Sequence, residues 1–131
     1  MADHGWANVT VIEADATTAA LLGPFDGAVA SLSMSVLPDV DRAVRNVYDA
    51  MRPGARFVVF DLRPVAAGPA RILNPGIRWF LQWYANWNPH ADVSAALTRV
   101  FDEAAFVETY AWGTAYTMVA RRTDAAPPER A

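Results

Sequence analysis

Short apolar runs and one amphipathic stretch alternate along the first half of the chain. Asn8 to Ala14 and Phe25 to Ser33 are brief and largely apolar, which predicts two strands buried in a sheet. Ala55 to Asp61 has a continuous apolar centre and should form a strand in the middle of that sheet. Between the second and third runs, apolar residues recur every three or four positions, which predicts a helix from Asp41 to Met51. Asp39 or Asp41 can cap its start.

The second half carries a different pattern, dense in aromatic residues and ending in two further strands. A helix is predicted from Gly76 to Asn86, and Asp92 can cap another helix that continues to Phe101. The run AFVETYAWGTAYTMVARR, residues 105–122, predicts two antiparallel strands around Trp112-Gly113. Residues 123–131, TDAAPPERA, predict a disordered tail.

Together these elements predict one α/β domain over residues 1–122. Strands alternate with helices in the first half, which is the order in which crossover helices join parallel strands. We therefore expect a sheet of parallel strands that is completed by a C-terminal antiparallel hairpin.

The composition agrees with a folded domain and excludes several kinds of partner. Of 131 residues, 53% are hydrophobic and 19% are charged, and the net charge is -3. A chain with this charge and no basic run is not expected to bind nucleic acid. It has no cysteine, which excludes disulfides and thiolate metal sites, and His4 and His90 are too far apart in sequence to suggest a metal pair. Neither a signal peptide nor a transmembrane segment is apparent, so we expect a cytoplasmic protein.

Polar side chains follow the apolar runs at the points where the predicted strands end. Asp15, Ser31, Ser33 and Asp61 occupy these positions. In an open parallel sheet, ligands bind beyond the carboxyl ends of the strands, where loops and helix N-termini meet. This edge of the sheet is therefore the predicted binding site.

The order and spacing of these segments resemble those of the class I S-adenosylmethionine-dependent methyltransferases. The resemblance rests on VTVIEADA, PFDGAVASLSMSVLPD, the amphipathic helix and MRPGARFVVFD, and it extends from Val9 to Arg122. It implies a partial Rossmann-like methyltransferase sheet, with the family's strand order 3-2-1-4-5-7-6. It also implies S-adenosylmethionine as cofactor and a small or lipid-like acceptor, as in relatives that methylate quinones or lipid headgroups. MRPGA resembles the turn before the family's fifth strand, with Ala55 in place of the second glycine.

The same resemblance implies which residues bind the cofactor. The family's third strand ends in an Asp-Ala pair, which Asp15 and Ala16 match. The carboxylate would accept from the adenine amino group and the next backbone N–H would reach a ring nitrogen, as an adenine edge requires. Ala30 to Ser33, including Ser31 and Leu32, would line the methionine part of the cofactor. Alternatively, Asp15 only caps the turn that follows the strand.

The most specific element of the family has no counterpart in this sequence. The family's first strand, glycine-rich loop and ribose-binding acid should precede Val9, so the chain is expected to begin in mid-domain and to bind the cofactor less tightly. The strand at Phe25 would then expose an edge. Three arrangements would cover that edge: the Val9 strand beside it, a second copy of the chain in a homodimer, or a separate polypeptide that supplies the first half.

An aromatic stripe and two polar residues are further candidates. Trp79, Trp83 and Trp87 repeat every four residues, which places them on one side of a helix. They form either a lid over a hydrophobic acceptor or a packing surface in the core or a dimer. Methyl transfer from a sulfonium needs alignment more than acid–base help, so no catalytic base is assigned. Tyr116 and Glu108 are candidates by chemical type alone.

Two functions of different kinds follow. The first is S-adenosylmethionine-dependent methyl transfer to a small or lipid-like acceptor by a truncated domain that needs a missing N-terminal half. The second is a non-catalytic module with a truncated methyltransferase fold that self-associates.

Overall fold

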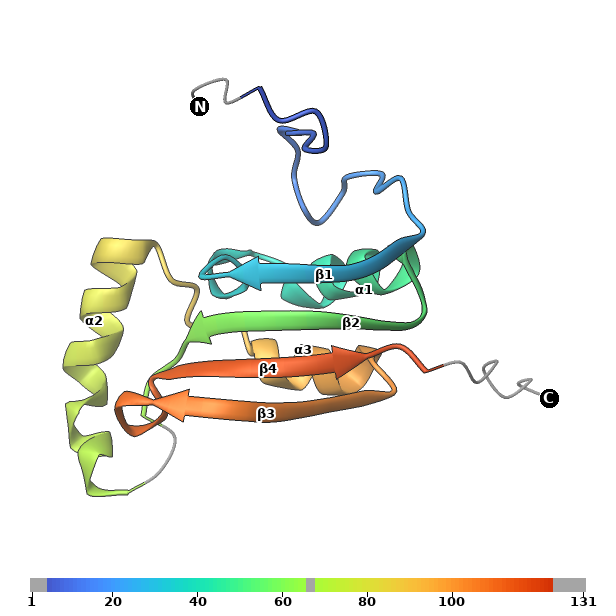
Figure 1. Ribbon diagram of the computed structural model, residues 1–131. Helices are drawn as coiled ribbons and strands as arrows, with labels where there is room; N and C mark the ends of the chain where they lie inside the picture. Colours follow the sequence, from blue (N-terminus) through green and yellow to red (C-terminus); the bar gives the residue numbers. More distant parts are fainter. Residues whose placement is uncertain (1–4, 66–67, 124–131) are drawn as a thin grey trace.

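The computed structural model describes residues 5–65 and 68–123 and shows a sheet with two helices packed on one face and a third at its end (Figure 1). The strands are β1 (Phe25–Ser31), β2 (Met51–Leu62), β3 (Glu103–Tyr110) and β4 (Ala115–Arg121). The α-helices are α1 (Val40–Ala50), α2 (Asn74–Ala85) and α3 (Val93–Val100). Short 3₁₀ helices lie between them, namely η1 (Met34–Val36), η2 (Pro69–Leu73) and η3 (Ala111–Gly113).

The strands have the order β1-β2-β4-β3. β2 pairs with β1 in parallel and with β4 antiparallel, so it lies inside the sheet as predicted. β3 and β4 form the expected C-terminal antiparallel pair. The predicted α/β fold is therefore confirmed, and the observed order agrees with the 4-5-7-6 part of the order that the resemblance implied.

One face of the sheet is buried against α1 and α3. Along β2, Phe57 and Val59 point toward these helices and are buried, whereas Val58 and Phe60 point to the opposite face and are partly exposed. This alternation is the two-residue period of a strand with a helix layer on one side only. The largest apolar side chains among those that are fully buried are Val44, Phe57, Val59, Leu97 and Met118.

No helix in the described ranges covers the opposite face of the sheet, which Figure 1 turns toward the viewer. Val29, Val58 and Val119 lie in register across β1, β2 and β4 on that face. The side chain of Val29 is 78% exposed. Among the described residues, β1 also has a strand neighbour on one side only. An apolar face next to an open strand edge favours contact with another polypeptide.

The strand predicted from Asn8 to Ala14 is absent from the structure. These residues pair with no strand in the described part of the chain, and Val11 and Ile12 are each 71% exposed. An extended segment gains its backbone hydrogen bonds only from a neighbouring strand, and no described strand lies beside this one. The prediction was wrong because an apolar pattern does not show whether such a neighbour exists. The Val9 strand therefore does not cover the open edge of β1.

A turn follows this segment and contacts α1. The side-chain amide of Asn46 donates to the backbone carbonyls of Ala16 and Ala19, at 3.0 and 2.8 Å. The N-terminal segment is therefore held by a helix rather than by the sheet.

Helices α1 and α3 begin at caps that the sequence predicted, and for α1 the cap is Asp39 rather than Asp41. Helix α2 begins at Asn74, two residues before the predicted Gly76. Asp39 accepts a hydrogen bond from the Arg42 N–H at the start of α1, and Asp92 accepts one from the Ala95 N–H at the start of α3. In the MRPGA turn, Gly54 has a φ of 83°. Ala55 needs no such left-handed conformation and is buried, so its replacement of a glycine is tolerated. The single domain over residues 1–122 stays a prediction, and residues 124–131 of the expected tail lie outside the described residues.

Arg122 joins the end of β4 to the end of α1. Its Nη1 donates to the backbone carbonyls of Tyr48 and Met51, each at 2.8 Å, and its guanidinium lies 4.6 Å from the centre of the Tyr48 ring. The last carbonyls of a helix lack partners within the helix and carry its negative end. A cation at this position therefore stabilises both the helix end and its contact with the sheet.

We expect Arg122→Gln to lower the free energy of unfolding by about 1–3 kcal/mol, because two backbone carbonyls lose a charged donor. Urea denaturation followed by circular dichroism measures this change. Arg121→Gln is the matched control, because Arg121 makes no hydrogen bond or ion pair with the described residues through its side chain. An equal loss in both variants would contradict the role of Arg122.

Candidate functional site

The carboxyl ends of β1 and β2 form one edge of the sheet, with α2 beyond it (Figure 1). Immediately after β1, the N–H of Leu32 donates to the carbonyl of Phe60 at 2.8 Å. Leu32 has a φ of 50°, in the left-handed region that residues other than glycine seldom adopt. The chain thus turns sharply at this point, and Ser31 and Leu32 are exposed at the edge.

Asp61, near the end of β2, is 1% exposed and is occupied by internal hydrogen bonds. Its Oδ2 accepts from the Ser35 N–H at 2.9 Å, and its Oδ1 accepts from the Ser35 hydroxyl at 2.5 Å and from the Leu62 N–H at 2.9 Å. A buried carboxylate with several donors around it is a structural anchor. Asp61 therefore binds η1 and does not face a ligand, although its position at a strand end had suggested that role.

The same contacts extend to the loop between α2 and α3. The carbonyl of Ser35 accepts from the Asn88 N–H at 2.8 Å, and the side-chain amide of Asn88 donates to the carbonyl of Leu37 at 2.8 Å. Asp61 therefore positions this loop through Ser35. Trp87, the residue before Asn88, is only 7% exposed.

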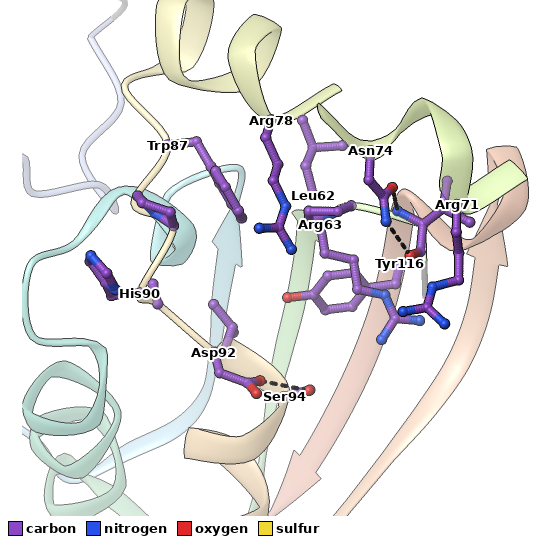
Figure 2. A pocket seen from close by; sticks show the side chains of 15 residues that line it. Leu62, Arg63, Arg71, Asn74, Arg78, Trp87, His90, Asp92, Ser94 and Tyr116 are labelled. Carbon is purple, nitrogen blue, oxygen red and sulfur yellow. Dashed lines mark hydrogen bonds between the residues drawn. The ribbon is translucent and has the colours of Figure 1, made fainter. Parts of the chain in front are cut away.

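A cavity of about 300 Å³ lies behind this loop, between α2, the start of α3, the end of β2 and the start of β4 (Figure 2). Its volume is at the lower end of the roughly 300–1,000 Å³ typical of small-molecule sites. The side chains that give it chemical character are Arg63, Arg71, Arg78, Trp87, Asp92 and Tyr116.

Tyr116 is the polar side chain at the base of this cavity. The residue is 2% exposed, and Figure 2 shows its hydroxyl directed into the cavity. Burial raises the pKa of the phenol far above its ordinary value, and the negative charge of Asp61 raises this pKa further. The phenol is therefore protonated at neutral pH and can donate a hydrogen bond, but it cannot act as a general base. Glu108, the other candidate by chemical type, does not line the cavity.

Asp15 and Ala16 lie in the turn before β1, and neither lines the cavity. Oδ1 of Asp15 accepts from the backbone N–H and the hydroxyl of Thr17, at 2.9 and 2.7 Å. These two hydrogen bonds hold the pKa of Asp15 below its ordinary value. The carboxylate thus caps the turn, as the alternative interpretation expected, while its Oδ2 and the Ala16 N–H make no hydrogen bond with the described residues.

The predicted tryptophan stripe is divided between two environments. The rings of Trp79 and Trp83 stack with centres 6.0 Å apart and are 66% and 70% exposed. Asn86 adopts a left-handed conformation and ends α2 at Ala85, so Trp87 leaves the helix and lines the cavity. The stripe therefore provides one wall of the cavity and one exposed aromatic pair.

The three arginines of the cavity come from separate segments of the sequence, and no motif connects them. Arg63 directly follows the Asp61–Leu62 end of β2, at the edge where a ligand was expected, and that position is the one signal that could have indicated it.

Two kinds of feature are absent from residues 5–65 and 68–123. No group of three or more His, Cys, Asp or Glu side chains there could hold a metal ion. No helix within the same ranges is long and apolar enough to cross a membrane.

Solved structures of several methyltransferases share this fold. A SAM-dependent methyltransferase from Thermotoga maritima, described as a possible histamine N-methyltransferase, superposes with a TM-score of 0.66 at 16% identity, over 88% of this chain and 65% of that one. The N-methyltransferase NodS from Bradyrhizobium japonicum gives 0.60 at 15% identity, over 92% and 63%. An O-methyltransferase family protein from Burkholderia thailandensis gives 0.62 at 9% identity, over 88% and 36%.

The chain therefore has the Rossmann-like fold of class I SAM-dependent methyltransferases and spans less than two thirds of the length of these neighbours. No protein-family model matches the sequence, and no curated protein matches it at a significant level.

We expect Asp61→Asn to lower the free energy of unfolding by about 1–3 kcal/mol, because the two buried donors of Ser35 bind both oxygens of Asp61 and an amide offers only one acceptor oxygen. Urea denaturation checks this value. Asp49→Asn, which makes the same change on the exposed surface of α1, should alter stability by less than about 0.5 kcal/mol. Equal stability of the Asp61→Asn variant and the unchanged protein would show that this network does not hold the edge together.

Proposed function

We propose that this chain takes part in S-adenosylmethionine-dependent methyl transfer and that the cavity at the carboxyl edge binds the acceptor. The observation that carries the proposal is the β1-β2-β4-β3 order with a cavity beyond the end of β2. Ligands of open α/β sheets bind outside the carboxyl ends of the strands, which is where this cavity lies.

The proposed cofactor contacts lie at the end of β1 and in the turn before it. Ser31 and Leu32 are exposed where β1 ends and would line the methionine part of S-adenosylmethionine. Asp15 and Ala16 would bind the adenine. Oδ2 of Asp15 and the N–H of Ala16 make no hydrogen bond within residues 5–65 and 68–123. They can supply the acceptor and the donor that an adenine edge requires, which supports this assignment.

On the acceptor side, the proposed role of the residues is alignment rather than proton transfer. The sulfonium of S-adenosylmethionine is an activated leaving group, so a correctly placed nucleophile needs little further help. Trp87 would provide an apolar wall, and the protonated hydroxyl of Tyr116 would donate to a polar atom of the acceptor.

A lipid-like acceptor is the finer part of this proposal. The exposed aromatic residues Trp79, Phe80, Trp83 and Tyr84 are on α2, the helix that also brings Arg78 to the cavity. Aromatic side chains on the helix beside a site can bind the apolar tail of an acceptor while the cavity holds its polar end.

The uncovered face of the sheet favours the presence of a partner polypeptide in the active protein. Val29, Val58 and Val119 form an apolar row beside the open edge of β1. We propose that a second copy of the chain covers this face and completes the cofactor site, so that the purified chain can assemble the site by itself.

Calorimetric titration of the purified chain with S-adenosylmethionine tests the proposal. We expect saturable binding in the micromolar range, which Asp15→Ala weakens about tenfold or more because one charge-assisted hydrogen bond is lost. Glu13→Gln, two positions away and equally exposed, is the control and should bind as the unchanged chain does. Absence of binding up to millimolar cofactor by the folded chain would contradict the proposal.

The second candidate is a non-catalytic module that self-associates, and the same open edge and apolar face favour it. In this case the cavity would have no catalytic role. No detectable binding of S-adenosylmethionine in the titration, together with a stable homodimer, would favour this candidate over the first.

Both candidates predict an oligomer that depends on Val29. We expect Val29→Lys to shift the chain toward monomer in analytical ultracentrifugation, because a charge on an apolar sheet face opposes its burial. Thr98→Lys, on the exposed surface of α3, is the control and should not change the association. A chain that is monomeric before any substitution would contradict this surface as an interface between copies.

A further inference from the structure

Three arginine residues from separate elements line the cavity. Arg63 follows β2, Arg71 is in η2 and Arg78 is in α2. Figure 2 shows Arg78 reaching from α2 into the cavity toward the Tyr116 hydroxyl, with Arg63 and Arg71 on the side of Asn74. The fold therefore brings together cations that lie up to fifteen positions apart in the sequence.

Little negative charge balances these cations. Asp92 supplies the only carboxylate that lines the cavity among the described residues. One of its oxygens already accepts from the Ser94 hydroxyl and the Ala95 N–H, each at 3.0 Å. Ion pairs in the described part of the chain involve other arginines, so Arg71 and Arg78 have no carboxylate partner there. Because like charges around a small volume repel one another, binding of an anion would be favourable.

The positive cavity contrasts with the chain as a whole, whose net charge is -3. A general excess of arginine therefore does not explain it. The excess of positive charge lies beside the carboxyl ends of the strands, and this position requires an explanation.

Arg63 is held in place before any ligand binds. Its Nε donates to the carbonyl of Gly113 at 2.9 Å, and its guanidinium lies 4.6 Å from the ring centre of Phe106 and 5.1 Å from that of Tyr116. These contacts fix the plane of the guanidinium, and its Nη groups make no hydrogen bond with the part of the chain that the structure describes. A planar guanidinium matches the paired oxygens of a carboxylate or phosphate. Because the Arg63 side chain is already held in place, it loses less conformational entropy when an anion binds.

We propose that Arg63, Arg71 and Arg78 form a binding site for an oxyanion, the carboxylate or phosphate group of the acceptor. The assignment to an acceptor rests on the function proposed above, whereas oxyanion binding does not. The Tyr116 hydroxyl supplies a further neutral donor, and Trp87 borders the space next to the charged group. The volume of about 300 Å³ fits a small acidic molecule or a lipid headgroup.

Calorimetric titration of the full chain with inorganic phosphate and, separately, with benzoate tests the site, with sodium chloride at equal ionic strength as the reference. We expect saturable binding of at least one of these anions. Arg71→Gln or Arg78→Gln should weaken it about tenfold or more, because each variant removes charged donors. Arg45→Gln is the matched control on the exposed surface of α1 and should leave the affinity unchanged.

Sedimentation with vesicles distinguishes a lipid headgroup from a free anion. Vesicles of phosphatidylcholine alone are compared with vesicles that also contain phosphatidic acid. Binding to the acidic vesicles that Arg78→Gln reduces and Arg45→Gln does not identifies a headgroup, and phosphate or benzoate binding alone identifies a free acid. The proposal is overturned if neither arm shows binding, or if Arg45→Gln reduces binding as much as Arg78→Gln.

The cofactor titration separates this inference from the proposed function. Oxyanion binding that depends on Arg78, in a chain that does not bind S-adenosylmethionine, supports the site and contradicts methyl transfer. Cofactor binding without oxyanion binding supports methyl transfer and contradicts the site.

Discussion

The buried carboxylate of Asp61 holds together the edge of the sheet on which the rest of the site depends. It binds the backbone and hydroxyl of Ser35 after β1, and Ser35 in turn binds Asn88 before α3. Segments from three parts of the chain therefore meet at one anchored point. Because the anchor is buried and its hydrogen bonds are made within the protein, it is not screened by solvent as a surface ion pair would be. The cavity beside Trp87 forms next to this anchored loop.

The two faces of the sheet differ in a way that bears on function. α1 and α3 bury one face, and their contacts with β2 and β4 form the core. The other face carries the row of Val29, Val58 and Val119 without a helix over it in the described residues. A sheet with one covered and one open face can carry a cavity at the ends of its strands and still present an apolar surface to another polypeptide.

The periodicity of apolar residues correctly predicted the helices and strands that pack against a neighbouring element. The helix caps Asp39 and Asp92 and the C-terminal hairpin followed directly from residue type and spacing. The strand from Asn8 failed because its pattern describes the segment alone, whereas a strand needs a partner. The cavity could not be predicted for a similar reason. Arg63, Arg71 and Arg78 come from separate elements. The contacts beside them join Arg63 to the Gly113 carbonyl and Asn74 to the Val65 backbone, and neither contact has a local signal in the sequence.

A crystal structure of the chain with S-adenosylmethionine tests the central claim, that this edge is a methyl-transfer site. The account predicts that the cofactor lies across the carboxyl end of β1 in contact with Ser31 and Leu32, with its methyl group facing the cavity lined by Trp87 and Tyr116. A cofactor bound away from this edge, or a methyl group directed away from the cavity, would contradict it.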